Sequence, residues 1–160
     1  MNSERFKTLI ELYHIESLSK ILGLNHGHNG IDLWNDILGI EVKCRYIKYG
    51  YRVAVHSYQI EQFRNENKNK ELFWCFLFYD LSIAPTQIKS EKVNRFVTRR
   101  EIWFIEWNWI NQFPISNAKT GPYVYIGKTQ FPDSNYFKKF HRRKDNLFVP
   151  NVSVLETMLA

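Results

Sequence analysis

The sequence predicts a mixed α/β fold in which a central β-sheet is flanked by helices. Near the N-terminus, Phe6, Leu9, Ile10 and Tyr13 recur at the spacing of one helical face. Residues 72–79 are apolar at almost every position, as in a strand that is covered on both faces. Shorter alternating segments lie between and beyond these two, and this mixture favours helices and strands that share a core.

Each element is expected from its own pattern. Segments that alternate apolar and polar residues, or are apolar throughout, predict strands over 31–34, 37–45, 51–56, 72–79, 101–109 and 123–127. A capping residue or helical spacing predicts helices that begin at Ser3, Ser57 and Ser153, and a basic helix over 133–145. Gly23 ends the first helix, and the polar stretch 82–100 is expected to be mainly loop.

Composition narrows the class of protein. A chain of 160 residues is the length of one domain, and 44% hydrophobic with 24% charged residues excludes disorder or a coiled coil as the main structure. The formal net charge of +6, with a pI near 9.3, favours a polyanionic partner such as nucleic acid.

The cysteines and the apolar runs indicate the compartment. Cys44 and Cys75 are too few for a disulfide framework or a four-thiolate zinc site, so we expect free thiols in a reducing environment. The N-terminus lacks the apolar core of a secretory signal, and the run 72–79 is too short to span a bilayer. We therefore expect a cytoplasmic protein with no membrane partner.

The predicted hairpin over 31–45 carries the candidate chemistry. With a turn at Asn35-Asp36, Asp32 pairs with Gly39 and lies diagonal to Glu41, with Cα atoms roughly 7–8 Å apart on one face. Two carboxylates at that distance can share a Mg²⁺ ion, for which the missing side chain of Gly39 is expected to leave room. Lys43 lies one strand period beyond Glu41, within reach of a water or a phosphate.

The opposite face of this hairpin is expected to be core, and it carries Ile31, Leu33, Leu38, Ile40 and Val42. An acid-x-lysine triplet is a weak signal alone, and a second one, Glu66-Asn-Lys68, falls in the polar helical stretch. The alternative for Glu41-Val-Lys43 is a solvated, charged hairpin face. Glu41-Val-Lys43 lies on an alternating strand and follows a strand that carries Asp32 in register. This placement favours a catalytic role over a solvated face.

Gly30 to Lys43, together with the helix before it, resembles the PD-(D/E)XK nuclease superfamily, which includes most type II restriction endonucleases. The resemblance runs from the first helix to about Tyr79, with Ile31 where the family has Pro. It implies a restriction-endonuclease-like fold, Asp32 and Glu41 as ligands of Mg²⁺, and Lys43 as the catalytic lysine. An acidic residue on the first helix often joins this site, and we prefer Glu16 to Glu11.

The resemblance also implies a division of the chain. Residues 1–160 form one nuclease domain, with the catalytic core in about 1–80, while 81–160 completes the sheet and the DNA-binding surface. Some family members place a Gln or Lys on the helix after the lysine strand. Gln59 and Gln62 match this only loosely, and a solvent-facing side chain is the favoured interpretation of both.

Basic residues outline the expected DNA surface, because Lys and Arg neutralise phosphates. The residues expected to bind DNA are Arg45, Lys48, Arg52, Lys138, Lys139, Arg142 and Arg143. Trp103, Trp107 and Trp109 alternate in a predicted strand and favour a core or a dimer interface.

These observations predict a Mg²⁺-dependent DNA endonuclease, specifically a type II restriction enzyme that acts as a homodimer on double-stranded DNA. A Holliday-junction resolvase or a repair nickase is the alternative within the same class. A basic nucleic-acid-binding module without catalysis, in which the hairpin acids are incidental, is the alternative from another class.

Overall fold

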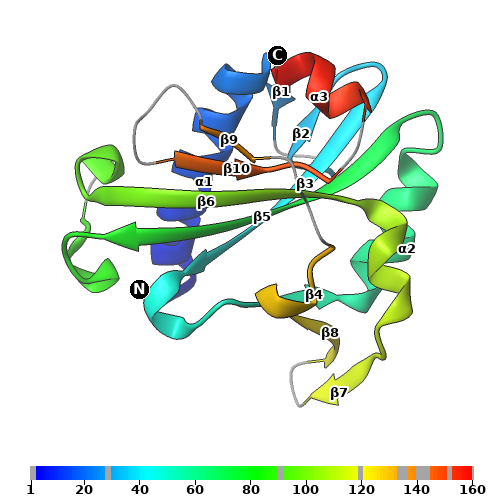
Figure 1. Ribbon diagram of the computed structural model, residues 1–160. Coiled ribbons are helices and arrows are strands. Elements are labelled where there is room, and N and C mark those ends of the chain that lie inside the picture. The colour runs from blue at the N-terminus through cyan, green and yellow to red at the C-terminus, as the bar shows by residue number, and fades with distance from the viewer. Residues whose placement is uncertain are drawn as a thin grey trace.

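A computed structural model describes residues 3–27, 30–89, 92–118, 121–132, 137–139, 145–150 and 153–159. Within these ranges the chain forms a mixed seven-stranded sheet in the order β1-β2-β3-β5-β6-β10-β9 and a three-stranded sheet in the order β4-β8-β7 (Figure 1). Helices accompany both sheets, so the predicted mixed α/β class is confirmed.

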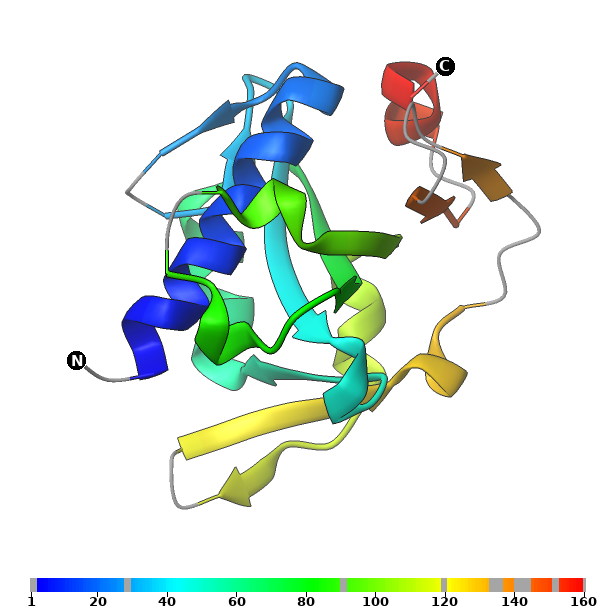
Figure 2. The same cartoon turned by 90° about the vertical axis from the view of Figure 1, so that its left-hand side faces the viewer.

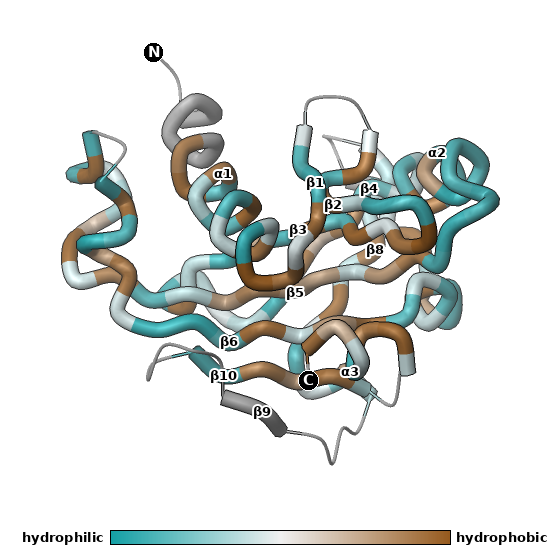
Figure 3. The backbone as a smooth tube through the Cα atoms, turned by 90° about the horizontal axis from the view of Figure 1, so that it is seen from above, coloured by the Kyte–Doolittle hydropathy of each residue, from teal (hydrophilic) through white to brown (hydrophobic). Residues whose placement is uncertain are grey.

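Three long strands form the centre of the larger sheet. β5 (Glu71–Leu81) runs parallel to β3 (Leu38–Tyr46) and antiparallel to β6 (Val97–Glu106). The stretch 72–79 is buried throughout, as its apolar pattern predicts, and it forms a brown band through the middle of Figure 3. β3 therefore lies beside the most buried strand, which fixes its position.

Short strands complete the larger sheet at both edges. β1 (Asn25–His26) and β2 (Leu33–Trp34) lie beside β3, and β10 (Asp145–Phe148) and β9 (Phe137–Lys139) lie beyond β6. The prediction of a helix over 133–145 is wrong where the structure describes it. Strand β9 and the start of β10 lie there instead, paired with each other. The side chains of 145–148 alternate between buried and half-buried, which is the two-residue period of a strand.

The helix α1 (Ser3–Leu22) covers one face of the larger sheet, and Gly23 follows it with a φ of 67°, which confirms the predicted helix end (Figure 2). Inside this face, the Arg100 guanidinium pairs with both oxygens of Asp145, at 3.1 and 2.7 Å, and donates to Ser17 Oγ. The buried pair connects β6 to β10, and Ser17 adds α1. The terminal helix α3 (Ser153–Leu159), expected from its capping residue, joins the same core through Leu155.

The other face is covered by α2 (Ser57–Glu66) and by the smaller sheet, made of β4 (Arg52–His56), β8 (Gly121–Gly127) and β7 (Ser116–Ala118). In Figure 2 the yellow strands β8 and β7 of this sheet lie along the bottom. Inward residues of both sheets and of α2 form this core, among them Val53, Val55, Ile60, Trp74, Phe76, Val124 and Ile126. The predicted strands over 51–56 and 123–127 therefore pair with each other, apart from the central sheet.

The predicted strand over 101–109 is only partly correct. β6 ends at Glu106, and the residues Trp107–Gln112 form a 3₁₀ helix. Trp107 is buried, stacks on Trp74 with 3.9 Å between ring centroids, and donates from its indole to the Ile60 carbonyl. The 3₁₀ helix places the Trp107 ring against these buried partners. The alternating tryptophans therefore do not mark a continuation of the strand. None of the helices in the described ranges is long and apolar enough to cross a membrane.

Candidate active site at the edge of β3

The β2–β3 hairpin sets the register of the candidate site. Trp34 lies opposite Gly39 and Leu33 opposite Ile40, so the predicted two-residue turn is wrong and the pairing is displaced by two residues. The side chain of Asn35 explains the longer turn, because its Oδ1 accepts from the amides of Ile37 and Leu38 at 2.9 and 2.8 Å. A displacement of two residues keeps every side chain on its predicted face.

Asp32 and Glu41 come together where the β2–β3 ladder ends. The Asp32 amide donates to Glu41 Oε1 at 3.3 Å, and the Val42 amide donates to Asp32 Oδ2 at 2.8 Å. In a continued ladder the Val42 amide would meet the Ile31 carbonyl, so the Asp32 carboxylate takes the place of a backbone acceptor. The two acids therefore lie opposite each other rather than diagonal, in closer contact than the sequence predicts.

Lys43 is held by two acceptors beside these acids. Its Nζ donates to Glu41 Oε2 at 3.2 Å and to Gln59 Oε1 on α2 at 2.8 Å. An ammonium group has three donors. Glu41 and Gln59 accept from two of these N–H groups. The contacts of the described residues include no third acceptor, so the third N–H is available to a group in the cavity.

The environment of Glu41 opposes its ionisation. Burial, followed by the neighbouring Asp32 carboxylate, raises the pKa of Glu41 to about 8, against the opposite effect of Lys43. The side chain of Glu41 is only 6% exposed and that of Lys43 is 21% exposed. The site is therefore an acid pair whose repulsion the single lysine does not offset.

A cavity of about 440 Å³ opens onto these groups. It lies where β3 has an uncovered edge, because β2 pairs only with Gly39 and Ile40 of that strand in the described part of the chain. Its lining comes from α1, β3, β4 and α2 as well as from Asp32, and consists of Glu11, Ile15, Asp32, Glu41, Val42, Lys43, Cys44, Arg45, Arg52, Val53, Ala54 and Gln59.

The first helix contributes Glu11 to this lining, whereas the preferred candidate, Glu16, is exposed on α1 and does not line the cavity. The two positions are five residues apart, which places them on different faces of a helix. Gln59 lines the cavity, against the expectation that it faces solvent. Gln62 is exposed and bonds Glu66 along its own helix.

The expected DNA-binding residues separate into two groups. Arg45 and Arg52 line the cavity, and the Arg45 guanidinium is held by the Tyr49 carbonyl at 2.7 Å. Lys48 is exposed beyond the end of β3, outside the lining.

Strand β9 carries Lys138 and Lys139 at the opposite edge of the sheet, about 19 Å from β3 at the usual strand spacing. The side chains of Lys138 and Lys139, and all of Arg142 and Arg143, lie outside the described residues. The structure thus places two of the expected arginines at the cavity and the β9 lysines on a distant strand.

Two details of the predicted faces are wrong. A Cβ on Gly39 would lie 2.8 Å from Leu72 Cδ2 and 3.0 Å from Ile31 Cδ1, so apolar side chains fill the space that was expected to hold an ion. Ile31 belongs to the core between the two sheets, on the side of Gly39, and not to the α1 side with Leu33. The chain diverges from β3 at Asp32, which turns Ile31 to the other side.

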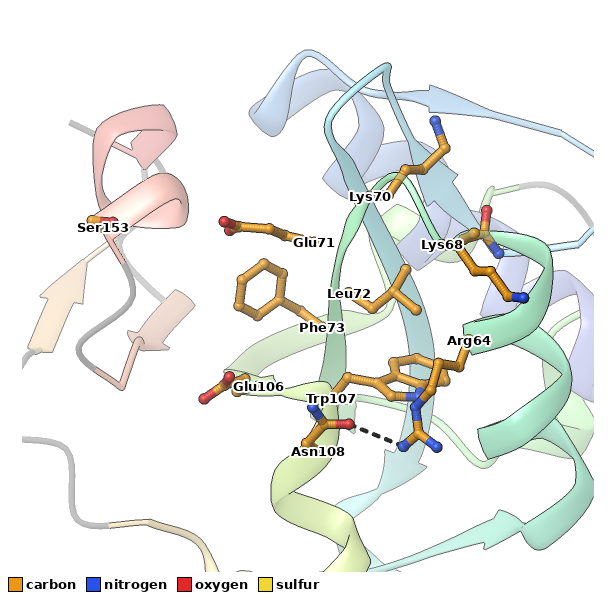
Figure 4. A pocket seen from close by; sticks show the side chains of 11 residues that line it. Arg64, Lys68, Lys70, Glu71, Leu72, Phe73, Glu106, Trp107, Asn108 and Ser153 are labelled. Carbon is orange, nitrogen blue, oxygen red and sulfur yellow. Dashed lines mark hydrogen bonds between the residues drawn. The ribbon is translucent and has the colours of Figure 1, made fainter.

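A second cavity, of about 550 Å³, lies at the start of β5 (Figure 4). Glu71 and Glu106 extend on the side that faces Ser153, and Arg64 and Lys68 lie at the end of α2. Arg64 is already bonded to Glu61 and Asn108, at 2.6 and 2.9 Å. The second acid-x-lysine triplet ends here, at Lys68, just after a helix, as its polar surroundings predict.

The oxygen donors at the β3 cavity fit a hard divalent cation. No group of three or more His, Cys, Asp or Glu side chains suited to a metal ion occurs within the described ranges. A pair of carboxylates is nevertheless a common donor set for Mg²⁺, which keeps several waters in its shell. Burial and then the neighbouring Asp32 carboxylate raise the pKa of Glu41, and a cation between the two acids would relieve their mutual repulsion.

Comparison with protein-family models, curated proteins and solved structures gives no match to this chain.

Proposed function

We propose that the protein is a Mg²⁺-dependent DNA endonuclease of the PD-(D/E)XK type, with its active site at the uncovered edge of β3. The observation that carries this proposal is the convergence of Asp32, Glu41 and Lys43 on one cavity, from a strand and a bend nine residues apart. A solvated hairpin face does not require a nearly buried Glu41 side chain, only 6% exposed, beside the half-buried Asp32.

Asp32 and Glu41 would hold the ion, and Glu11 adds a further carboxylate to the cavity wall. When bound there, Mg²⁺ supplies Lewis-acid polarisation of the phosphate and an activated water. Glu41 must lose its proton before it serves as a ligand, so its raised pKa in the metal-free protein makes binding of the ion stronger as pH rises.

Lys43 acts on the phosphate directly. In hydrolysis the attacking water gives up one proton to solvent as its oxygen forms a bond to phosphorus, one P–O ester bond breaks, and the leaving oxygen takes a proton from solvent. Negative charge grows on the phosphate oxygens in the transition state, and an ammonium held by Glu41 and Gln59 donates to them without reorganising. Arg45 and Arg52, which line the same cavity, attract the phosphate backbone of DNA to Lys43.

The experiment is digestion of supercoiled plasmid DNA with Mg²⁺, with the products read by end sequencing. We expect cleavage by the wild-type chain and none by Asp32→Ala or Glu41→Ala, with Ca²⁺ supporting binding without turnover. Salt-sensitive binding with no cleavage under any divalent ion would instead establish the binding module. Cleavage by Glu41→Ala at the wild-type rate would refute the site.

The type II restriction activity is the finer proposal. A double-strand cut in one encounter needs two sites that face antiparallel backbones, and a two-fold homodimer provides them. Sedimentation at micromolar concentration, together with the plasmid products, tests it. A monomer that accumulates only nicked circles would refute restriction and establish a nickase.

A further inference from the structure

The outer face of the smaller sheet carries a row of aromatic rings next to the candidate active site. Side chains alternate along β4 and β8, with Val53, Val55, Val124 and Ile126 directed to the core. The outward positions therefore include Arg52, Ala54 and His56 on β4, and Tyr123 and Tyr125 on β8, with Tyr58 beside them on α2. We call Arg52, His56, Tyr58, Tyr123 and Tyr125 the aromatic strip.

The strip is continuous. The Arg52 guanidinium lies 4.7 Å from the Tyr125 ring centroid, and the rings of Tyr125 and Tyr123 are 5.9 Å apart. His56 follows at 4.6 Å from Tyr123 and 4.1 Å from Tyr58, whose side chain is 55% exposed. The backbone makes room for this row, because a Cβ on Gly121 would lie 2.8 Å from His56 Nε2.

The strip begins inside the active-site cavity. Arg52 and Ala54 line the cavity that holds Asp32, Glu41 and Lys43, and Arg52 is also the first member of the strip. A ligand that lies along the strip therefore extends directly to Asp32, Glu41 and Lys43. This continuity separates the strip from exposed aromatic residues elsewhere, such as Tyr49, which is 65% exposed beyond the end of β3.

We propose that the aromatic strip binds an unpaired, single-stranded segment of the DNA substrate, next to the phosphate that is cut. This inference rests on the proposed nuclease function and names its substrate class. Aromatic faces stack on bases whose own faces are free, whereas a continuous duplex presents only base edges in its grooves. Branched or gapped DNA fits the strip better than an uninterrupted duplex, so the strip favours the resolvase or nickase alternative over the type II restriction activity.

The charge of the strip favours a polyanion over a second copy of the chain. Its described outward positions carry an arginine and a histidine and no carboxylate. In a two-fold dimer through this face, each Arg52 would meet a surface of the same composition, without an acid to pair with. Aromatic rings beside a cation are the usual combination for single-stranded nucleic acid.

The test is binding of a fluorescein-labelled single-stranded dT oligonucleotide by the full chain in EDTA, followed by anisotropy, with a duplex of equal length as the comparison. Tyr123→Ala and Tyr125→Ala should each weaken single-strand binding about fivefold or more and leave duplex binding within twofold. Tyr125→Phe keeps the ring and should bind like wild type. Trp34→Ala, an exposed aromatic residue on β2, is the matched control.

Three results would overturn the inference: unchanged single-strand binding in both alanine variants, equal losses in Tyr125→Phe and Tyr125→Ala, or a change from dimer to monomer on sedimentation of the variants. The proposed function fails separately. Single-strand binding that depends on the strip, in a chain that cuts no DNA with Mg²⁺, would refute the nuclease and retain the strip. Mg²⁺-dependent cleavage that is unchanged in Tyr123→Ala and Tyr125→Ala would retain the nuclease and refute the strip.

Discussion

Lys43 Nζ donates to Gln59 Oε1 at 2.8 Å, and this contact connects strand β3 to helix α2 across the candidate active site. A lysine side chain has four rotatable bonds, so a second acceptor besides Glu41 restricts where its charge lies. Among the hydrogen bonds of the described residues Gln59 contacts Lys43 and neither Asp32 nor Glu41, so we interpret it as a positioning residue for Lys43.

Gln59→Ala should lower the rate of DNA cleavage about ten- to a hundredfold, because a hydrogen bond to a charged group contributes roughly 1.5–3 kcal/mol. The loss should fall on kcat rather than on KM, and Gln59→Glu, which keeps an acceptor, should restore part of it. Gln62→Ala, one turn along the same helix and exposed, is the control. Equal losses in both alanine variants would indicate a general effect on α2.

Glu41 makes the stability of the metal-free protein depend on pH. Its pKa is about 8 when folded, against an ordinary value near 4.5, so between these values the folded state holds a proton that the unfolded state has lost. Stability therefore falls as pH rises through this window and levels off above about 8.

Glu41→Gln should remove this dependence, so that the variant gains on wild type by up to about 1.4 kcal/mol per pH unit between pH 5 and 8. Urea unfolding in EDTA at a series of pH values measures the difference, and Glu61→Gln, an exposed acid on α2, is the control. A constant difference between wild type and Glu41→Gln across the window would contradict the assigned ionisation.

The part of the site that depends on strand alternation could be predicted from the sequence. Asp32, Glu41 and Lys43 share a face whatever the exact turn, since a register displaced by two residues preserves the alternation. The turn itself could not be predicted, because it depends on two hydrogen bonds to the side chain of Asn35.

The contributions from distant elements could not be predicted either. Gln59 and Glu11 reach the cavity because α2 and α1 pack on opposite faces of the larger sheet, and each helix's rotation is set by which of its residues enter the core. The pairing of β4 with β8 joins segments about seventy residues apart, and no local pattern specifies it.

Arg52 should contribute to the salt dependence of DNA binding. It is exposed at the cavity rim, and among the described contacts no acid pairs with it to compete with a phosphate. Arg52→Ala should reduce the slope of log K against log salt by about 0.7 for single-stranded DNA, the value for one phosphate contact. Anisotropy across a series of KCl concentrations measures it, with Lys20→Ala on α1 as the control; equal slopes in all three proteins would place Arg52 away from DNA.

The ion pair between Arg100 and Asp145 should be essential for attaching β10 to the sheet. Both side chains are almost completely buried, with exposed fractions of 1% and 4%, and two hydrogen bonds join them. Asp145→Ala would leave a buried guanidinium without its carboxylate, which costs about 3–5 kcal/mol, far more than a surface pair. Thermal unfolding should show a decrease in Tm of roughly 10 °C.

The control is Glu61→Ala, which removes the exposed pair with Arg64 and should cost at most about 1 kcal/mol. The double variant Arg100→Met with Asp145→Leu should recover most of the stability lost in Asp145→Ala, because apolar side chains of similar volume carry no desolvation cost. An Asp145→Ala variant as stable as Glu61→Ala would mean that β10 is not held against β6 in solution. The same variant with normal single-strand binding would show that the aromatic strip, on the other face of the sheet, does not depend on this attachment.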